Sequence, residues 1–186
     1  MNKANNDGAT PLLVAAQEGR MKIADLLVEN DQVVIDAEDS SGTTPLYVAA
    51  QNGERTIAAL LIKKGADANN RGGGVSPLWI AAQEGHRDLV ELLVTDAHAD
   101  VNLPARSNGA TPLYVAAQNG HVDVAAVLMA HSADVNQASS DGVTPLFIAA
   151  QKGATTVVAL LVTKGKAHVN QANKNGVNPL AVAAEQ

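Results

Sequence analysis

The sequence predicts an all-α solenoid of stacked antiparallel helix pairs with projecting loops, built from one repeat unit. A Gly-x-[Thr/Ser/Asn]-Pro-Leu cluster returns six times, with its proline at Pro11, Pro45, Pro77, Pro112, Pro145 and Pro179. The prolines are 34, 32, 35, 33 and 34 residues apart, and a period near 33 is typical of solenoids. The same letters follow each proline, as in TPLYVAAQNG and SPLWIAAQEG.

The first element of each unit is a short helix that begins at the proline. In the second unit Thr44 precedes Pro45, so a threonine hydroxyl can cap a helix whose first position suits proline. The helix is expected to end at Gly53, because glycine readily adopts the left-handed conformation that ends helices. Its apolar residues run almost all round, which predicts a helix packed between neighbours.

The second element is an amphipathic helix. Ile57, Leu60 and Leu61 recur at i, i+3 and i+4. The equivalent residues in the other units are Leu26/Leu27, Leu92/Leu93, Val127/Leu128 and Leu160/Leu161. Because one helix pair cannot bury both of its faces alone, the units are expected to stack on one another.

These elements divide the chain into repeats. We expect one domain over residues 1–186, with repeats at 7–40, 41–72, 73–107, 108–140 and 141–174 and a partial sixth repeat at 175–186. The sixth repeat stops at Gln186, inside its first helix, which suggests a fragment of a longer array or a shortened chain.

The composition argues against several classes of protein. The formal net charge is -6 and the basic residues are scattered, so a nucleic-acid partner is not expected. There are no cysteines, no apolar leader and no apolar run of membrane-spanning length. We therefore expect an intracellular protein without a membrane partner, in the cytoplasm or alternatively the nucleus.

The order T-P-L-x-x-A-A-x-x-G, then L-L, then G-A-D-V-N resembles the consensus of ankyrin repeats, over residues 7 to 186. One departure is that the family's usual histidine after Thr-Pro-Leu is replaced, so the resemblance implies loss of its hydrogen bond to the projecting loop. The residues found there are Leu13, Tyr47, Trp79, Tyr114, Phe147 and Ala181.

The resemblance implies a protein-binding scaffold whose concave surface of loops and first helices grips a partner protein or extended peptide. Carried over residue by residue, the partner-binding residues would be Tyr47, Gln51, Asn52, Trp79, Gln83, Glu84, Asn108, Ala110, Tyr114, Gln118, Asn119, Asp141, Val143, Phe147 and Gln151. The resemblance also makes the asparagines at the end of the second-helix turn candidates for hydroxylation: Asn69, Asn102, Asn136 and Asn170.

Two rows of residues have two interpretations each. The aromatic residues Tyr47, Trp79, Tyr114 and Phe147 occupy one repeat position, and they either fill gaps between first helices or contact a partner. Five glutamines recur at Gln17, Gln51, Gln83, Gln118 and Gln151. They either form an inter-repeat ladder or offer amide donors and acceptors to a partner backbone.

No residues point to catalysis or to a cofactor. The glycine run at 72–74 lacks the Gly-Lys-Ser/Thr ending of a phosphate-binding loop and is interpreted as a flexible loop. The five histidines lack paired ligand spacing, so neither a metal nor a small-molecule substrate is expected. The alternatives to a binding scaffold are a structural spacer, an engineered scaffold without a native ligand, and the recruiting region of a larger enzyme.

Overall fold

The computed structural model describes residues 2–184, and within that range it contains only α-helices and loops. The helices are α1 (Pro11–Gln17), α2 (Met21–Val28), α3 (Pro45–Gln51), α4 (Arg55–Lys63), α5 (Pro77–Glu84), α6 (Arg87–Thr95), α7 (Pro112–Gln118), α8 (Val122–Ala130), α9 (Pro145–Gln151), α10 (Thr155–Thr163) and α11 (Pro179–Ala183). The predicted stop at Gln186 lies outside the described residues. For the part of the chain described, the predicted all-α stack of five helix pairs and a final single helix is confirmed.

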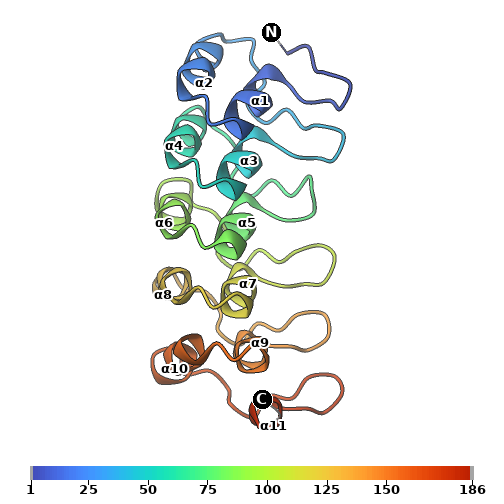
Figure 1. Cartoon of the computed structure of the whole chain (residues 1–186), viewed down its shortest axis with the longest axis vertical. Coiled ribbons are helices and arrows are strands. Elements are labelled where there is room, and N and C mark those ends of the chain that lie inside the picture. Colours follow the sequence, from blue (N-terminus) through green and yellow to red (C-terminus); the bar gives the residue numbers. More distant parts are fainter. Residues whose placement is uncertain (1, 185–186) are drawn as a thin grey trace.

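The helices form two columns. The odd-numbered first helices stack on one another in one column, and the even-numbered second helices stack beside them in the other (Figure 1). A loop projects from the first-helix column before each proline, and we call it the finger of that repeat. Each repeat therefore contacts mainly the repeats before and after it, as expected of a solenoid.

The start of each first helix is set by a side-chain cap. Thr44 Oγ1 accepts a hydrogen bond from Tyr47 N at 3.2 Å, and Pro45 follows the cap as the first helical residue. Five other caps accept the equivalent hydrogen bond from the backbone N–H three residues later: Thr10, Ser76, Thr111, Thr144 and Asn178. Because helices of five to nine residues are unstable in isolation, these caps and the packing between repeats hold them in place.

Small side chains let the two columns approach closely. Ala49 and Ala50 are fully buried on α3, and Ile57 and Leu61 on α4 are fully buried beside them. The same pattern of alanine pairs and aliphatic residues continues through repeats two to four as one core. Small and aliphatic side chains therefore fill this core in place of bulky aromatic residues.

The expectation for the second helix of repeat one is wrong in one respect. Leu26 was assigned to its apolar pattern, but its side chain is 68% exposed, and Ile23 on the same helix is 51% exposed. Ala24 and Val28 carry the burial on α2 instead. The physical reason is that α2 packs mainly on α1 and α4, because within residues 2–184 no second helix lies on its other side.

The fingers are joined to one another by backbone hydrogen bonds. Ser40 N donates to Asp7 O at 3.0 Å, and Ser140 N donates to Asn108 O at 2.8 Å. The glycine run contributes here, because a Cβ on Gly72 would collide with the carbonyl oxygen of Gly42. Close contact between neighbouring fingers therefore accounts for the glycine at position 72.

A second ladder joins the turns that follow the second helices. Asn69 Oδ1 accepts from Asp100 N at 2.8 Å, and two further asparagines, Asn102 and Asn136, repeat this bond to the next repeat at the same distance. In repeat one the acceptor is Asp36, whose Oδ2 lies 3.0 Å from Asp67 N. These side chains fix the position of each repeat relative to the next.

Candidate functional site

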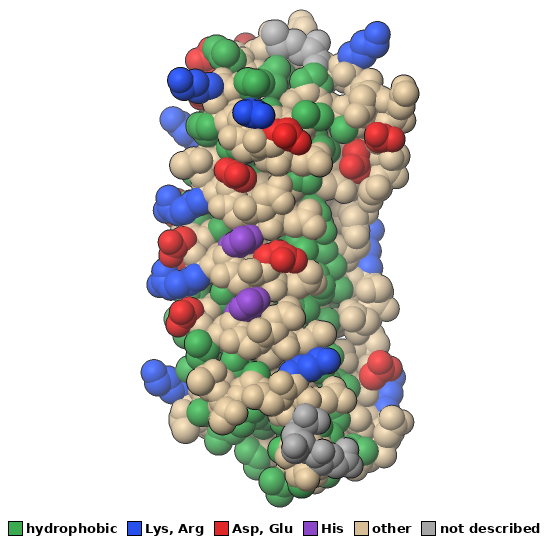
Figure 2. All heavy atoms as spheres, in the orientation of Figure 1, with side chains coloured by type: hydrophobic (Ala, Val, Ile, Leu, Met, Phe, Trp, Pro, Cys, Tyr) green, Lys and Arg blue, Asp and Glu red, His purple; other side chains and the backbone are tan. Residues whose placement is uncertain are grey.

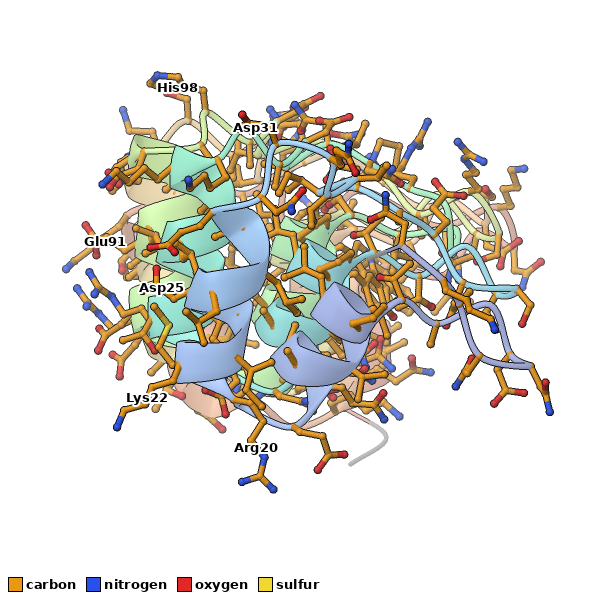
Figure 3. The ribbon with its side chains drawn as sticks, turned by 90° about the horizontal axis from the view of Figure 1, so that it is seen from above. Arg20, Lys22, Asp25, Asp31, Glu91 and His98 are labelled. Carbon is orange, nitrogen blue, oxygen red and sulfur yellow. The ribbon has the colours of Figure 1, made fainter. Side chains whose placement is uncertain are left out.

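The fingers and the first helices share one surface, which we call the finger face, and most of the predicted partner-binding residues belong to these elements. The view along the stack in Figure 3 shows the fingers projecting on one side. The labelled side chains of Lys22, Asp25 and Glu91 point away from the second helices on the other side. The two columns thus separate a charged outer surface from the finger face.

Two cavities are present in the finger face. One, of about 520 Å³, lies between repeats one and two, and the other, of about 430 Å³, lies between repeats three and four. The first is lined by Leu13, Gln17, Glu18, Asp39, Thr43, Tyr47, Val48, Gln51 and Asn52, and the second by Trp79, Gln83, Glu84, Asn108, Val115, Gln118 and Asn119. Both are open and mostly polar, as suits a protein or peptide ligand.

Three of the four aromatic rings are available at this surface. Tyr47, Trp79 and Tyr114 are half-buried, and each packs against the hydrophobic core with part of its surface exposed. Phe147 is only 4% exposed. Its predicted role as a binding residue is therefore corrected, because the buried ring offers almost no surface to a partner.

Trp79 shows what sequence reasoning missed about this position. Its indole Nε1 donates a hydrogen bond to Ala110 O, in the next finger, at 2.9 Å. In repeat three an indole N–H thus supplies a hydrogen bond from the first helix to a finger, where the histidine of the family consensus is replaced. The signal was present in the sequence, since a partly buried tryptophan N–H usually finds an acceptor.

Ala110 is the second residue to be corrected. Its side chain is 1% exposed at the base of the finger, so it cannot contact a partner. The neighbouring Asn108 is exposed, and its Oδ1 accepts a hydrogen bond from Ala110 N at 3.1 Å. Among the other predicted finger residues, Asp141 is exposed and Val143 is half-buried.

The glutamine row does not form a side-chain ladder. Within residues 2–184, the only hydrogen bond from these five amides is from Gln83 Nε2 to Glu84 Oε1, at 3.0 Å. The backbone carbonyls at these positions link the repeats instead: Asn52 Nδ2 donates to Gln17 O at 3.0 Å, and Asn119 Nδ2 to Gln83 O at 3.2 Å. The amide side chains are left available to a ligand.

Two histidines join this network, and the sequence interpretation gave them no role. His86 Nε2 lies 2.9 Å from Gln51 O, and His121 Nε2 lies 3.0 Å from Gln83 O. Since a carbonyl only accepts, the Nε2 hydrogen is the donor in both bonds. The recurrent Gly-His pair before α6 and α8 was the available signal.

Burial and nearby negative charge affect both half-buried tyrosines. Burial raises the pKa of Tyr47 above its usual value, and the charge of Glu84 raises it further. Burial raises the pKa of Tyr114 in the same way, with a further contribution from Asp141. Deprotonation of these phenols is thus opposed both by burial and by nearby carboxylates.

The ion pairs in the described part of the chain lie on a second helix and not on the finger face. Arg87 on α6 contacts Asp88 at 2.8 Å and Glu91 at 3.0 Å, both on the second helix of repeat three. Figure 2 shows acidic side chains and two histidines along the middle of one side of the stack, with a basic side chain farther down. The acidic side chains of the finger face have no ion-pair partner within residues 2–184.

Between residues 2 and 184, no three histidine or acidic side chains are grouped so that they could hold a metal ion. None of the described helices is long and apolar enough to cross a membrane.

Comparison with known proteins identifies one family. A family model described as "Ankyrin repeats (3 copies)" matches the chain over residues 1–72, 69–139 and 133–186. The matches together extend along the whole sequence. No curated protein matches the chain.

Proposed function

Because the chain belongs to the ankyrin-repeat family, we propose that it binds a partner protein or an extended peptide through its finger face. Ankyrin repeats are in general protein–protein interaction modules and non-catalytic scaffolds. The observation that carries the proposal is the row of glutamine amides beside half-buried aromatic rings. We place this activity in the cytoplasm, with the nucleus as the alternative.

The central repeats offer the best surface for binding. Trp79 and Tyr114 lie on consecutive first helices, α5 and α7, which pack against each other. Partly exposed aromatic rings are frequent hot-spot residues because they offer a large contact area at little cost in conformational entropy. Gln118 lies one helical turn beyond Tyr114 and lines the second cavity, so a partner could contact both.

Selection from a random 12-residue peptide library on the intact protein tests the proposal. The selected peptides should bind Tyr114→Ala/Gln118→Ala about 5- to 150-fold more weakly than the parent, as expected for truncation of hot-spot residues. The matched control Asp123→Asn on α8, an exposed second-helix residue, should leave binding within about two-fold. Fluorescence anisotropy measures each affinity.

Two further measurements separate binding from folding. Tyr114→Phe retains the ring, so it should bind like the parent if packing and contact depend on the ring rather than on the hydroxyl. Circular dichroism should show the same helix content in all variants. Peptides that bind equally well to the double variant, or that lose binding only in Asp123→Asn, would contradict the proposal.

A further inference from the structure

The finger face has a second period, two repeats long. The residue after each glutamine of the row alternates: Glu18, Asn52, Glu84, Asn119 and then Lys152. A cavity lies at the junctions where a glutamate repeat is followed by an asparagine repeat, which are repeats one and two and repeats three and four. The two cavities are therefore equivalent in register.

Each cavity combines the same kinds of group. The first places Glu18 near Gln17, Gln51 and Asn52, with the ring of Tyr47 in its wall. The second has the equivalent residues Glu84, Gln83, Gln118 and Asn119, and its ring, Trp79, lies at the position of Leu13 in the first cavity. One carboxylate, three amide side chains and one aromatic ring recur in both cavities. The recurrence in register of the carboxylate and the three amides distinguishes these cavities from a chance cluster of acidic residues.

The charge of both cavities has one sign. No Lys or Arg is among the described residues that line either cavity, and Asp39 adds a second carboxylate to the first. Arg71, one of two finger arginines in this region, is directed elsewhere, because its Nη1 donates to Pro104 O at 2.8 Å. Glu84 also adds to the negative potential at Tyr47, so the first cavity lies within its field.

We infer that each cavity takes one cationic side chain, so that the preferred ligand is an extended segment of another protein carrying two Lys or Arg residues. This inference rests on the proposed function and names the class of partner for the same surface. The carboxylates would pair with the cations, since charge-assisted hydrogen bonds are the strongest that an open site can offer. The exposed parts of the Tyr47 and Trp79 rings would add cation–π contacts.

The spacing of the two cations follows from the packing. Helices pack about 8–10 Å apart, so cavities two repeats apart are separated by roughly 16–20 Å. An extended chain rises about 3.3 Å per residue, and its alternate side chains point to the same side. The two basic residues should therefore be at i and i+6 of the ligand. In repeat five Lys152 occupies the position of Glu18 and Glu84, so the acidic surface is limited to repeats one to four.

The same random 12-residue library tests the inference through the composition of the selected peptides. Basic residues should be enriched as pairs six positions apart. For a synthetic peptide of this type, Glu18→Gln/Glu84→Gln should weaken binding about ten-fold or more, and each single substitution about three-fold. Asp25→Asn on α2, which removes one negative charge from the outer surface, is the matched control and should change binding less than about two-fold.

The peptide itself provides the second arm. Replacing one basic residue by glutamine, or moving the pair to i and i+3, should remove most of the affinity. Added salt should weaken binding of the parent peptide more than binding of these altered peptides. Binding that depends on Tyr114 and Gln118 but not on Glu18 and Glu84 would overturn the inference and leave the proposed function intact. Selected peptides without paired basic residues, or no selected peptide at all, would also overturn it.

Discussion

Ile23 and Ile57 occupy the same position in repeats one and two, twelve residues after the proline, yet their environments differ completely. Ile57 is fully buried and Ile23 is 51% exposed. The same position is buried in repeats three, four and five, by Leu89, Val124 and Val157. What differs is the neighbour: α4 packs against α2, whereas no second helix precedes α2 in the described structure.

The other end of the stack shows the complementary effect. Leu146 and Leu180 both follow the repeat proline, but Leu146 is 3% exposed and Leu180 is 71% exposed. Within the described residues, α11 packs on α9 and has no second helix of its own. The comparison shows that identical residues gain or lose burial through the adjacent repeat, which is the physical basis of stability in a solenoid.

Alanine substitution of Ile57 and Ile23 should give the largest difference in stability between an interior repeat and the end of the stack. Ile57→Ala removes a fully buried side chain between two repeats and should lower the free energy of unfolding by about 2–5 kcal/mol. Ile23→Ala should lower it by less than about 1 kcal/mol, because half of the side chain is already in water. Urea unfolding followed by circular dichroism measures both, and equal losses would break the comparison between the end and the interior.

Substitution of Asp36 should give a smaller change in stability than Ile57→Ala, and one of opposite sign. Burial raises the pKa of its carboxyl group, the hydrogen bond from Asp67 N lowers it, and the charges of Asp67 and Glu38 raise it. With its net shift upward, the folded protein takes up this proton at higher pH than the unfolded chain, so the ionised carboxylate destabilises the fold at neutral pH. The equivalent residue in later repeats is asparagine, which makes the same bond without charge.

Asp36→Asn should therefore stabilise the protein at pH 7, by about 0.5 kcal/mol once solvent screening is allowed for. The gain should shrink as the pH falls through the folded pKa of Asp36, because the parent carboxyl then becomes neutral as well. Urea unfolding at several pH values measures the difference. A stability gain that stays constant down to the unfolded pKa would exclude ionisation of Asp36 as its cause.

Much of the fold could be predicted from the repeat pattern. Each first helix begins at its predicted proline, because the preceding cap and the proline ring are local signals. The exposure of Leu26 could not be predicted from its own sequence, since the pattern of repeat one matches that of the buried repeats. Burial there depends on a neighbour that the local sequence does not encode.

The candidate site was predictable to a smaller extent. The register identified Tyr47, Trp79 and Tyr114 as one row, and all three pack against the core while remaining half-exposed. It could not show that Phe147 is buried whereas the other rings are half-exposed, because the packing around each ring decides that. The two cavities were also missed, although the alternation of Glu18, Asn52, Glu84 and Asn119 was visible in the sequence.

Amide hydrogen exchange, with and without a selected peptide, tests most directly the claim that the covered central repeats provide both the stability and the binding surface. In the free protein, exchange should be slowest in repeats three and four and fastest in residues 175–184, where Leu180 is exposed. The peptide should add protection in α5, α7 and the finger between them, and none in α6 or α8. Uniform exchange along the free chain, or new protection confined to the second helices, would contradict the account.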